Sequence, residues 1–315
     1  MKKVPLVGIV IVNWNKKEMT GECLKSLEKT SYKNYKVILI DNGSTDGSIT
    51  YLKKINKEIT IIRLKENLGY TCGTNIGWKY AIEKLKADYI CAMDNDIVTI
   101  QTKWLNLIIK ELEKSDEYGI GSGKHIYKDG ALQPPFINSD LKDSHQKDKG
   151  QYNFIKEVDG FGGPCIIIKR STIEKIGYYD ENFFYGPNDI DYCLRARKEG
   201  IKIIYNGFSK SIHIGSGTGK VKNDKIFGKQ VEGGMIYLLR HAKISETSSL
   251  ILKNFIRSFI TRIDTRNKIK INNLIFYNTF LKRMFYFIIG IISSIMKYKK
   301  IDNNTVLNYN LNLLK

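Results

Sequence analysis

The amino-acid sequence predicts an α/β protein whose parallel sheet is covered by helices on both faces. Short apolar runs such as Val37 to Ile40 and Tyr89 to Met93 show no polar alternation, which is typical of strands buried on both faces. These runs alternate with segments of helical spacing, the pattern of parallel sheets. With 315 residues, 42% of them hydrophobic, the chain is long enough to bury a substantial core.

The first hundred residues carry the clearest elements. Val4 to Val12 is rich in Val and Ile and predicts the first strand, and Lys16 to Thr30 repeats apolar or small residues at a helical spacing. The remaining expected elements of this part are strands at Val37–Ile40, Ile59–Leu64 and Tyr89–Met93, and helices at Ser48–Lys54 and Gly73–Leu85.

The rest of the chain is less regular. Gly119 to Asp159 is broken by Gly, Pro and charged residues and predicts strands and loops, whereas the pattern from Lys225 onward is almost entirely helical. Between them we expect helices at Trp104–Lys114, Ser171–Ile176 and Asp189–Glu199 and strands at Cys165–Lys169 and Ile201–Tyr205. The Gly-rich stretch Gly215–Gly219 is the expected boundary between a domain of residues 1–219 and a basic, mostly helical region of residues 220–315.

Basic residues are in large excess, 51 Lys and Arg against 32 Asp and Glu, for a net charge of +19. This charge indicates an anionic partner but does not choose among nucleic acid, nucleotide and lipid. Residues 220–315 hold 18 of the basic and 5 of the acidic residues, so most of the excess lies there. The basic residues of this C-terminal region are mixed with Ile and Phe, so we expect contact of residues 250–300 with an anionic membrane. A helical subdomain packed on the core, with a solvated basic face, is the alternative.

The cysteines and the N-terminus bear on the compartment. Five widely spaced cysteines without a CxxC pair favour buried free thiols in a reducing cytosol. The first apolar run ends at Asn13 without a small-residue cleavage site, which favours a first strand over a signal peptide. No stretch reaches the roughly 18 apolar residues of a spanning helix. We therefore expect a cytoplasmic protein that is peripheral on the inner face of the cell membrane.

Acidic residues gather at the ends of the expected elements. Asp41 follows one apolar strand, Asp94 and Asp96 follow another, and Asp189 and Asp191 open a helix. Carboxylates at the carboxyl end of a strand face the ligand crevice, and two of them one residue apart can hold a hard divalent cation. A bare Asp-x-Asp is common in turns, so placement after a buried strand is what favours a metal site. A lone histidine such as His213 is more often structural, although imidazole suits Mn²⁺.

Six motifs follow one another along the chain: IVIVNWN (9–15), VILIDNGSTD (37–46), NLGYTCGTNIG (67–77), YICAMDND (89–96), DGFGGPCIIIKR (159–170) and FYGPNDIDYCLRAR (184–197). In order and spacing they resemble glycosyltransferase family 2, most closely its rhamnosyltransferase and galactofuranosyltransferase-like branch. The resemblance covers about residues 6 to 217.

This resemblance implies a GT-A fold, a Rossmann-like mixed sheet flanked by helices, followed here by a C-terminal helical extension. Residues 1–100 would form the nucleotide-binding half and residues 101–219 the acceptor half. The implied partners are a nucleoside-diphosphate sugar, such as a dTDP-rhamnose-like or UDP-sugar, and a glycan or lipid-linked acceptor. The implied cofactor is Mn²⁺ or Mg²⁺, and the implied reaction is a single inverting displacement in polysaccharide biosynthesis of the cell envelope.

The family's functional residues carry over by position. Asp41 matches the nucleobase contact, and Asp94 matches the first Asp of the DxD motif, on the ribose and diphosphate side. Asp96 matches the metal ligand, and His213 a histidine that completes the metal or diphosphate site. The donor pocket would also be lined by Val12, Asn13, Asn67, Gly69 and Gly163.

The chain departs from the family at the catalytic base: the family usually shows Glu-Asp-x-Asp, and this chain has Asn188-Asp189-Ile190-Asp191. Asp189 is the expected base and Asp191 the alternate; the other Asp would be a first-turn acid favoured by the helix dipole. Arg195 follows Asp191 by four residues, so it could contact the diphosphate or form an ion pair on one helix face.

Two other classes of function remain as alternatives. A sugar nucleotidyltransferase would share the α/β core but needs a Gly-rich basic loop where Asn13-Trp14-Asn15 stands. A basic nucleic-acid- or membrane-binding protein without catalysis would also explain the charge. Because the basic residues lie among Ile and Phe, we expect no nucleic-acid partner. The donor sugar, the acceptor linkage and the oligomeric state do not follow from the sequence.

Overall fold

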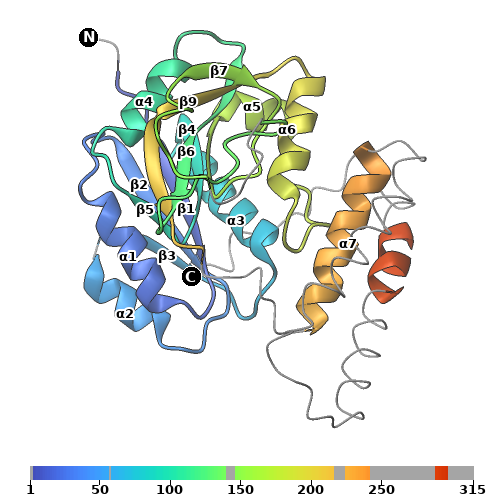
Figure 1. Ribbon diagram of the computed structural model, residues 1–315. Helices are drawn as coiled ribbons and strands as arrows, with labels where there is room; N and C mark the ends of the chain where they lie inside the picture. Colours follow the sequence, from blue (N-terminus) through green and yellow to red (C-terminus); the bar gives the residue numbers. More distant parts are fainter. Residues whose placement is uncertain (1–2, 57, 140–145, 216–223, 242–287, 297–315) are drawn as a thin grey trace, which may run out of the picture. The chain divides into compact units, whose positions relative to one another are not determined.

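The computed structural model describes residues 3–56, 58–139, 146–215, 224–241 and 288–296 (Figure 1). These residues fall into two compact units. The first unit contains residues 3–180 and 188–215, and the second contains Glu181–Pro187, helix α7 (Asp224–His241) and a helix at residues 288–296. The boundary expected between residues 219 and 220 lies outside the described residues.

The first unit is built on a nine-stranded sheet with the strand order β3-β2-β1-β4-β8-β6-β9-β5, and β7 pairs with β9 as well. Strands β1 to β4 are parallel, whereas β8 is antiparallel to both of its neighbours, β4 and β6. The strands are β1 (Val7–Asn13), β2 (Tyr35–Asp41), β3 (Thr60–Arg63), β4 (Tyr89–Asp94), β5 (Ile97–Thr99), β6 (Tyr118–Tyr127), β7 (Ile155–Val158), β8 (Cys165–Lys169) and β9 (Lys202–His213).

Helices cover both faces of this sheet, as the continuous apolar strands predict. On one face, α1 (Lys17–Leu27), α2 (Ser48–Ile55) and α4 (Trp104–Leu112) contribute to one buried cluster with the odd-numbered core residues of β1. On the other face, α3 (Tyr70–Glu83), α5 (Arg170–Ile176) and α6 (Asn188–Lys198) contribute to a second cluster. Figure 1 shows α1 and α2 on the side of the sheet opposite α3.

Two glycines of α3 let this helix lie directly on the first strand. A Cβ at Gly77 would fall 2.3 Å from Cγ1 of Val10, and one at Gly73 would fall 3.1 Å from Cγ1 of Val12. A larger residue at either position would push the helix from the sheet. The close approach brings the N-terminal end of α3 beside the carboxyl end of β1.

The last strand is longer than the sequence indicates. We expected it to end at Tyr205, but β9 continues to His213 and pairs in its second half with β5, which the sequence analysis missed. The register between β6 and β9 shifts between Gly123 and Lys124, where Ser209 approaches Gly123. This irregularity interrupts the apolar pattern that would otherwise have identified a twelve-residue strand.

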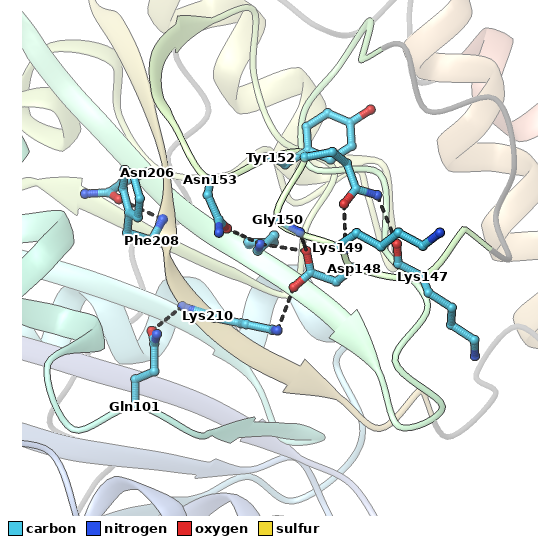
Figure 2. Close-up of polar contacts among 12 residues, drawn as sticks. Gln101, Lys147, Asp148, Lys149, Gly150, Tyr152, Asn153, Asn206, Phe208 and Lys210 are labelled. Atoms are coloured by element: carbon cyan, nitrogen blue, oxygen red, sulfur yellow. Dashed lines mark hydrogen bonds and ion pairs between the residues drawn. The ribbon is translucent and has the colours of Figure 1, made fainter.

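A buried ion cluster ties the segment before β7 to β6 and β9. Nζ of Lys124, a side chain 1% exposed, donates to Oδ1 of Asp148 at 2.9 Å and also to Asn153. Nζ of Lys210 lies 2.6 Å from the other oxygen of Asp148, and Figure 2 shows this carboxylate held between its partners. Burial alone would raise the pKa of Asp148, but hydrogen bonds from the two lysines lower it to about 2.

The second unit pairs two helices through small residues. A Cβ at Gly290 would lie 2.8 Å from the backbone oxygen of Gly228 in α7, and Oγ of Ser293 donates to Glu232 at 2.9 Å. The opposite side of helix 288–296 exposes aliphatic residues, among them Ile292 at 51%. Within the described residues, no helix is long and apolar enough to cross a bilayer. Of residues 250–300, which we expect to contact a membrane, the structure describes only 288–296.

Candidate active site at the carboxyl ends of the parallel strands

Strands β2, β1 and β4 end side by side, and their last residues form the floor of the candidate site. Val12 is paired in register with Asp94, and Asn13 with Asp41. Nδ2 of Asn13 donates to Oδ1 of Asp41 at 3.1 Å, and both side chains are fully buried. Three predicted donor-pocket residues and the first Asp of the DxD motif thus lie in two adjacent cross-strand rows, Val12 with Asp94 and Asn13 with Asp41.

The loop before α3 is held at the end of β2 by Asn42, a residue that the sequence analysis did not single out. Its Nδ2 donates to Oδ1 of Asn67 and to the backbone oxygen of Gly69, both at 3.0 Å, and its Oδ1 accepts from Leu68 N. Gly69 has a φ of 92°, which glycine adopts without strain. Asn67 and Gly69 are therefore positioned by the turn that follows Asp41.

Asp94, Asp96 and His213 bring one ligand atom each to within 4.8 Å of one another. The two aspartates frame the short turn between β4 and β5, and His213 is the last residue of β9, paired in register with Ile97 of β5. Nε2 of His213 lies 3.3 Å from Oδ1 of Asp96. The residues predicted as metal ligands are therefore adjacent, although 117 positions separate Asp96 from His213 in the chain.

The His213 ring is held from two further directions. Its Nδ1 lies 2.8 Å from Oε1 of Gln133, and the ring stacks on Tyr127 with centroids 6.2 Å apart. Burial lowers the pKa of His213, but the hydrogen bond and charge of Asp96 outweigh burial, so the pKa lies above its usual range. Neither Gln133 nor Tyr127 lies in a sequence motif, so the sequence alone did not point to either residue.

The pKa of Asp94 is raised by burial and by neighbouring negative charges. Burial and the neighbouring charge of Asp96 raise its pKa well above the usual range of a carboxyl group, and the charge of Asp189 adds to this. The hydroxyl of Tyr70, the first residue of α3, donates to Asp94 and opposes part of that shift. Such like-charge repulsion is relieved when a cation lies between the carboxylates.

Asp189 stands at the start of α6, close enough for its charge to raise the pKa of Asp94. Its carboxylate accepts from the backbone N–H of Ile190 at 3.0 Å and from that of Gly163. Burial raises its pKa to about 6, although these hydrogen bonds oppose the shift. A carboxylate whose pKa lies near neutrality is suited to general base catalysis.

Asp191 lies on a different side of α6 and is engaged elsewhere. Its side chain is 1% exposed, and Nε of Arg195 donates to Oδ2 at 3.0 Å. The guanidinium also donates to the backbone oxygens of Ile176 and Tyr178. The ion pair considered from the four-residue spacing is therefore present. The two residues join α6 to the end of α5, which favours Asp189 over Asp191 as the base.

A hydrogen-bond chain connects the two predicted parts of the site. Oγ1 of Thr20, a fully buried α1 residue, donates to Oδ1 of Asn13 at 2.7 Å and accepts from Nδ2 of Asn95 at 2.9 Å. Asn13 belongs to the predicted nucleoside side, and Asn95 lies between the two aspartates of the DxD motif. The sequence analysis missed Thr20 because nothing in the helical pattern of α1 distinguishes it.

The donor set of the three-residue cluster fits a divalent cation. Two carboxylates and one imidazole are ligands that Mn²⁺ accepts, and Mg²⁺ prefers the carboxylates. Asp96 is 8% exposed and Asp94 and His213 are half-buried, so the cluster keeps an open side for further ligands. Among the described residues, no other group of three or more acidic, His or Cys side chains lies close enough together to hold a metal ion.

Residues 8–177, more than half of the chain, match Glycosyl transferase family 2. The low-salt glycan biosynthesis hexosyltransferase of Haloferax volcanii is 26% identical over 202 residues, covering 62% of this chain and 63% of that protein. The GalNAc(5)-diNAcBac-PP-undecaprenol beta-1,3-glucosyltransferase of Campylobacter jejuni is 20% identical over 206 residues, covering 65% and 64%. The matched part thus spans less than two thirds of either relative's own length.

Solved glycosyltransferases share the fold. A mannosyltransferase from Pyrobaculum calidifontis, in complex with GDP-Man and Mn²⁺, superposes with a TM-score of 0.58 at 14% identity, covering 96% of this chain and 89% of that one. GalNAc-T7 with UDP, GalNAc and Mn²⁺ superposes with a TM-score of 0.56 at 15% identity, covering 83% and 57%. The predicted GT-A fold, a mixed sheet flanked by helices, is confirmed.

Proposed function

The chain belongs to Glycosyl transferase family 2, and from this membership we propose that it transfers a sugar from a nucleoside-diphosphate sugar to a hydroxyl group of a glycan or lipid-linked acceptor. The reaction we propose is a metal-dependent, inverting displacement. Relatives that act in glycan biosynthesis, and structural neighbours crystallised with nucleotide or nucleotide sugar and Mn²⁺, support this choice of substrates and cofactor.

One observation carries the proposal. The ligand atoms of Asp94, Asp96 and His213 lie within 4.8 Å of one another, and the charge of Asp189, a carboxyl group whose pKa is about 6, reaches this cluster. The cluster can hold a diphosphate through a cation, and the separate carboxylate can take a proton. These are the two chemical needs of glycosyl transfer to a hydroxyl group.

A divalent cation held by Asp94, Asp96 and His213 would compensate the negative charge that grows on the leaving diphosphate. In the same step, the acceptor oxygen attacks the anomeric carbon from the opposite face while the bond to the diphosphate oxygen breaks. Asp189 removes the proton of the acceptor hydroxyl, and the diphosphate leaves with the bonding electrons. Configuration at the anomeric carbon is inverted.

Val12, Asn13 and Asp41, at the ends of β1 and β2, would contact the nucleoside. We expect Asn67 and Gly69, hydrogen-bonded to Asn42 at the end of β2, to shape the wall around the diphosphate and the sugar. Donors for the first tests are dTDP-rhamnose-like and UDP-sugars, which follow from the resemblance to the rhamnosyl- and galactofuranosyltransferase-like branch. The GDP-Man of the Pyrobaculum calidifontis neighbour makes GDP-sugars the next donors to test.

Thermal unfolding of the full chain with a panel of nucleotide sugars, with Mn²⁺ or with EDTA, tests this function. We expect one donor to raise the melting temperature by several degrees in Mn²⁺ and by much less in EDTA, because ligands that bind only the folded state stabilise it. The selected donor is then assayed for metal-dependent hydrolysis or transfer. A donor-induced shift that is equal in Mn²⁺ and EDTA would contradict metal dependence.

We further propose that the protein is cytoplasmic and peripheral on an anionic membrane, which it contacts through the second unit. The outward side of helix 288–296 exposes Ile288, Ile289, Ile292, Ile295 and Met296 by 42% to 59%. In the sequence this helix lies between the basic pairs Lys282-Arg283 and Lys299-Lys300. Aliphatic side chains beside basic residues suit insertion among acyl chains next to anionic headgroups.

A further inference from the structure

Gln133 is the residue outside the predicted motifs that most directly contacts the candidate metal cluster. Its Oε1 lies 2.8 Å from Nδ1 of His213, and no other hydrogen bond to this ring nitrogen is recorded among the described residues. On the other side of the ring, Nε2 faces Oδ1 of Asp96 at 3.3 Å. The two nitrogens of His213 therefore have different partners, one an amide oxygen and the other a candidate metal ligand.

An amide oxygen accepts hydrogen bonds and cannot donate them, so this contact requires a proton on Nδ1. When His213 is protonated, both nitrogens carry a proton and the contact is kept. When the ring is neutral, the amide oxygen stabilises the tautomer with the proton on Nδ1 and a lone pair on Nε2. The nitrogen directed at Asp96 is then the one that can coordinate a cation.

The backbone around Gln133 is held by hydrogen bonds of its own, apart from the side-chain contact with His213. Gln133 N donates to the backbone oxygen of His125 in β6 at 3.1 Å, and its neighbour Leu132 forms a bridge to Ile126. Strand β6 is paired with β9, so that Tyr127 lies in register with His213. The segment that carries Gln133 is thus bound to β6, and this places its side-chain amide beside the end of β9.

We propose that Gln133 is a positioning residue for a divalent cation bound at Asp94, Asp96 and His213: it holds the Nδ1–H tautomer of His213 and directs the Nε2 lone pair to the cation. This inference rests on the proposed metal-dependent function. Partners of this kind, which hold the distal nitrogen of a metal-bound histidine, typically contribute a factor of about 10 to 100 in metal affinity.

The test measures Mn²⁺ binding by isothermal titration calorimetry in the full-length wild type and in Gln133→Leu, which keeps a similar side-chain size without the acceptor. We expect the dissociation constant to rise by about 10-fold or more. Gln133→Glu restores an acceptor at the same place, so its Mn²⁺ affinity should return to or exceed that of the wild type. Gln151→Leu is the matched control, because Gln151 is an exposed residue bonded to nearby backbone, and its affinity should not change.

A second readout separates positioning from a general structural effect. In ¹⁵N-histidine NMR spectra at a Mg²⁺ concentration that just saturates the wild type, the wild type and Gln133→Glu should show Nδ1 of His213 protonated. Gln133→Leu should show a mixture of tautomers, because its weaker site is partly empty and the free ring lacks the acceptor for Nδ1–H. All variants should unfold at similar temperatures in EDTA. An unchanged tautomer and unchanged Mn²⁺ affinity in Gln133→Leu overturn the role of Gln133 alone. A wild type that binds no Mn²⁺ overturns the metal-dependent function as well.

Discussion

The role of a single side chain at this site depends on the residues around it, and Asp189 shows this most clearly. In sequence it is one of two acids at the start of a helix, and the pattern alone could not separate base from ion-pair partner. Three-dimensional placement favours Asp189 as the base, because Asp191 is paired with Arg195 while the charge of Asp189 acts on Asp94. Functional assignment at this scale depends on neighbours more than on residue type.

We predict that Asp189→Asn lowers the turnover number by at least 10²-fold while the dissociation constant for the nucleotide donor stays within about 3-fold. The amide keeps the size of the carboxylate but cannot take the acceptor proton. Turnover is measured under saturating donor and acceptor, and donor affinity by calorimetry. Full transfer activity in this variant would remove Asp189 as the base.

The pH dependence of turnover should follow the same carboxylate. Burial raises the pKa of Asp189 to about 6, so the group is protonated and inactive as a base at lower pH. We expect turnover to fall about tenfold per pH unit below pH 6 and to level off above it, measured between pH 5 and 8. A rate independent of pH across this range would contradict a base with this pKa.

At the cation site, Asp96→Ala should abolish metal-dependent transfer and weaken Mn²⁺ binding by at least 10²-fold, because the variant loses a charged ligand and a partner of His213. Calorimetry and a transfer assay measure the two effects. Asp116→Ala is the control, since Asp116 is exposed and lies outside the site. Equal Mn²⁺ affinity in both variants would contradict the cluster as the metal site.

The sequence predicted the site's acids and missed the residues that hold them. Asp41, Asp94 and Asp96 follow buried apolar strands, and topology alone brings such positions together. Thr20 and Gln133 make contacts across 75 and 80 positions of the chain. Their roles depend on which segments fold beside each other, and local patterns do not carry that information.

At the level of elements, the apolar strands and the helices between them were predicted to within a few residues, whereas the polar strands were not. Strand β6 contains Lys124 and His125, both buried, and lies almost entirely in the stretch Gly119 to Asp159, for which the sequence predicts strands and loops without bounds. Each of these buried polar side chains has a partner in the structure: Asp148 pairs with Lys124, and Ser211 is hydrogen-bonded to His125. Burial without such partners would cost too much free energy to be tolerated.

The ion cluster of β6 and β9 predicts a pH-dependent contribution to stability. Asp148→Asn should lower the free energy of unfolding by roughly 3 kcal/mol near pH 7, since two cations lose a buried partner. The pKa of Asp148 is lowered in the folded protein from 3.8 to about 2. The stabilisation is therefore complete above pH 4 and lost as the pH falls from about 4 to 2.

Urea unfolding of the wild type and Asp148→Asn at several pH values measures this difference. Asp129→Asn is the matched control, because Asp129 pairs with Lys147 on the surface with 59% of its side chain exposed. An exposed pair contributes about 0 to 1 kcal/mol. A loss in Asp148→Asn no larger than that in Asp129→Asn would show that the cluster does not stabilise the fold.

For the whole molecule, strand and helix alternation identified the α/β class, and the structure confirms it. The alternation could not reveal that β8 enters the sheet antiparallel between β4 and β6, because direction leaves no mark on a continuous apolar strand. Only the resemblance to a known fold implied a mixed sheet. The domain boundary and the membrane contact stay predictions.

The membrane contact is testable in the full chain. We predict that replacing Ile288, Ile292 and Ile295 by Ser lowers the fraction that sediments with anionic phospholipid vesicles by about tenfold or more, because three exposed aliphatic chains no longer insert. Ile100→Ser, at a residue 46% exposed in the first unit, should sediment as the wild type does. Equal sedimentation of all three proteins would contradict contact through helix 288–296.

The placement of His213 at the end of β9 also concerns how the protein is made. During synthesis, Asp94 and Asp96 emerge from the ribosome long before His213, so the complete cluster cannot exist until β9 has been synthesised and has paired with β6 and β5. A cation that binds all three ligands would therefore stabilise only chains in which β9 is in place. Chains that end before β9 would lack this stabilisation and stay open to degradation.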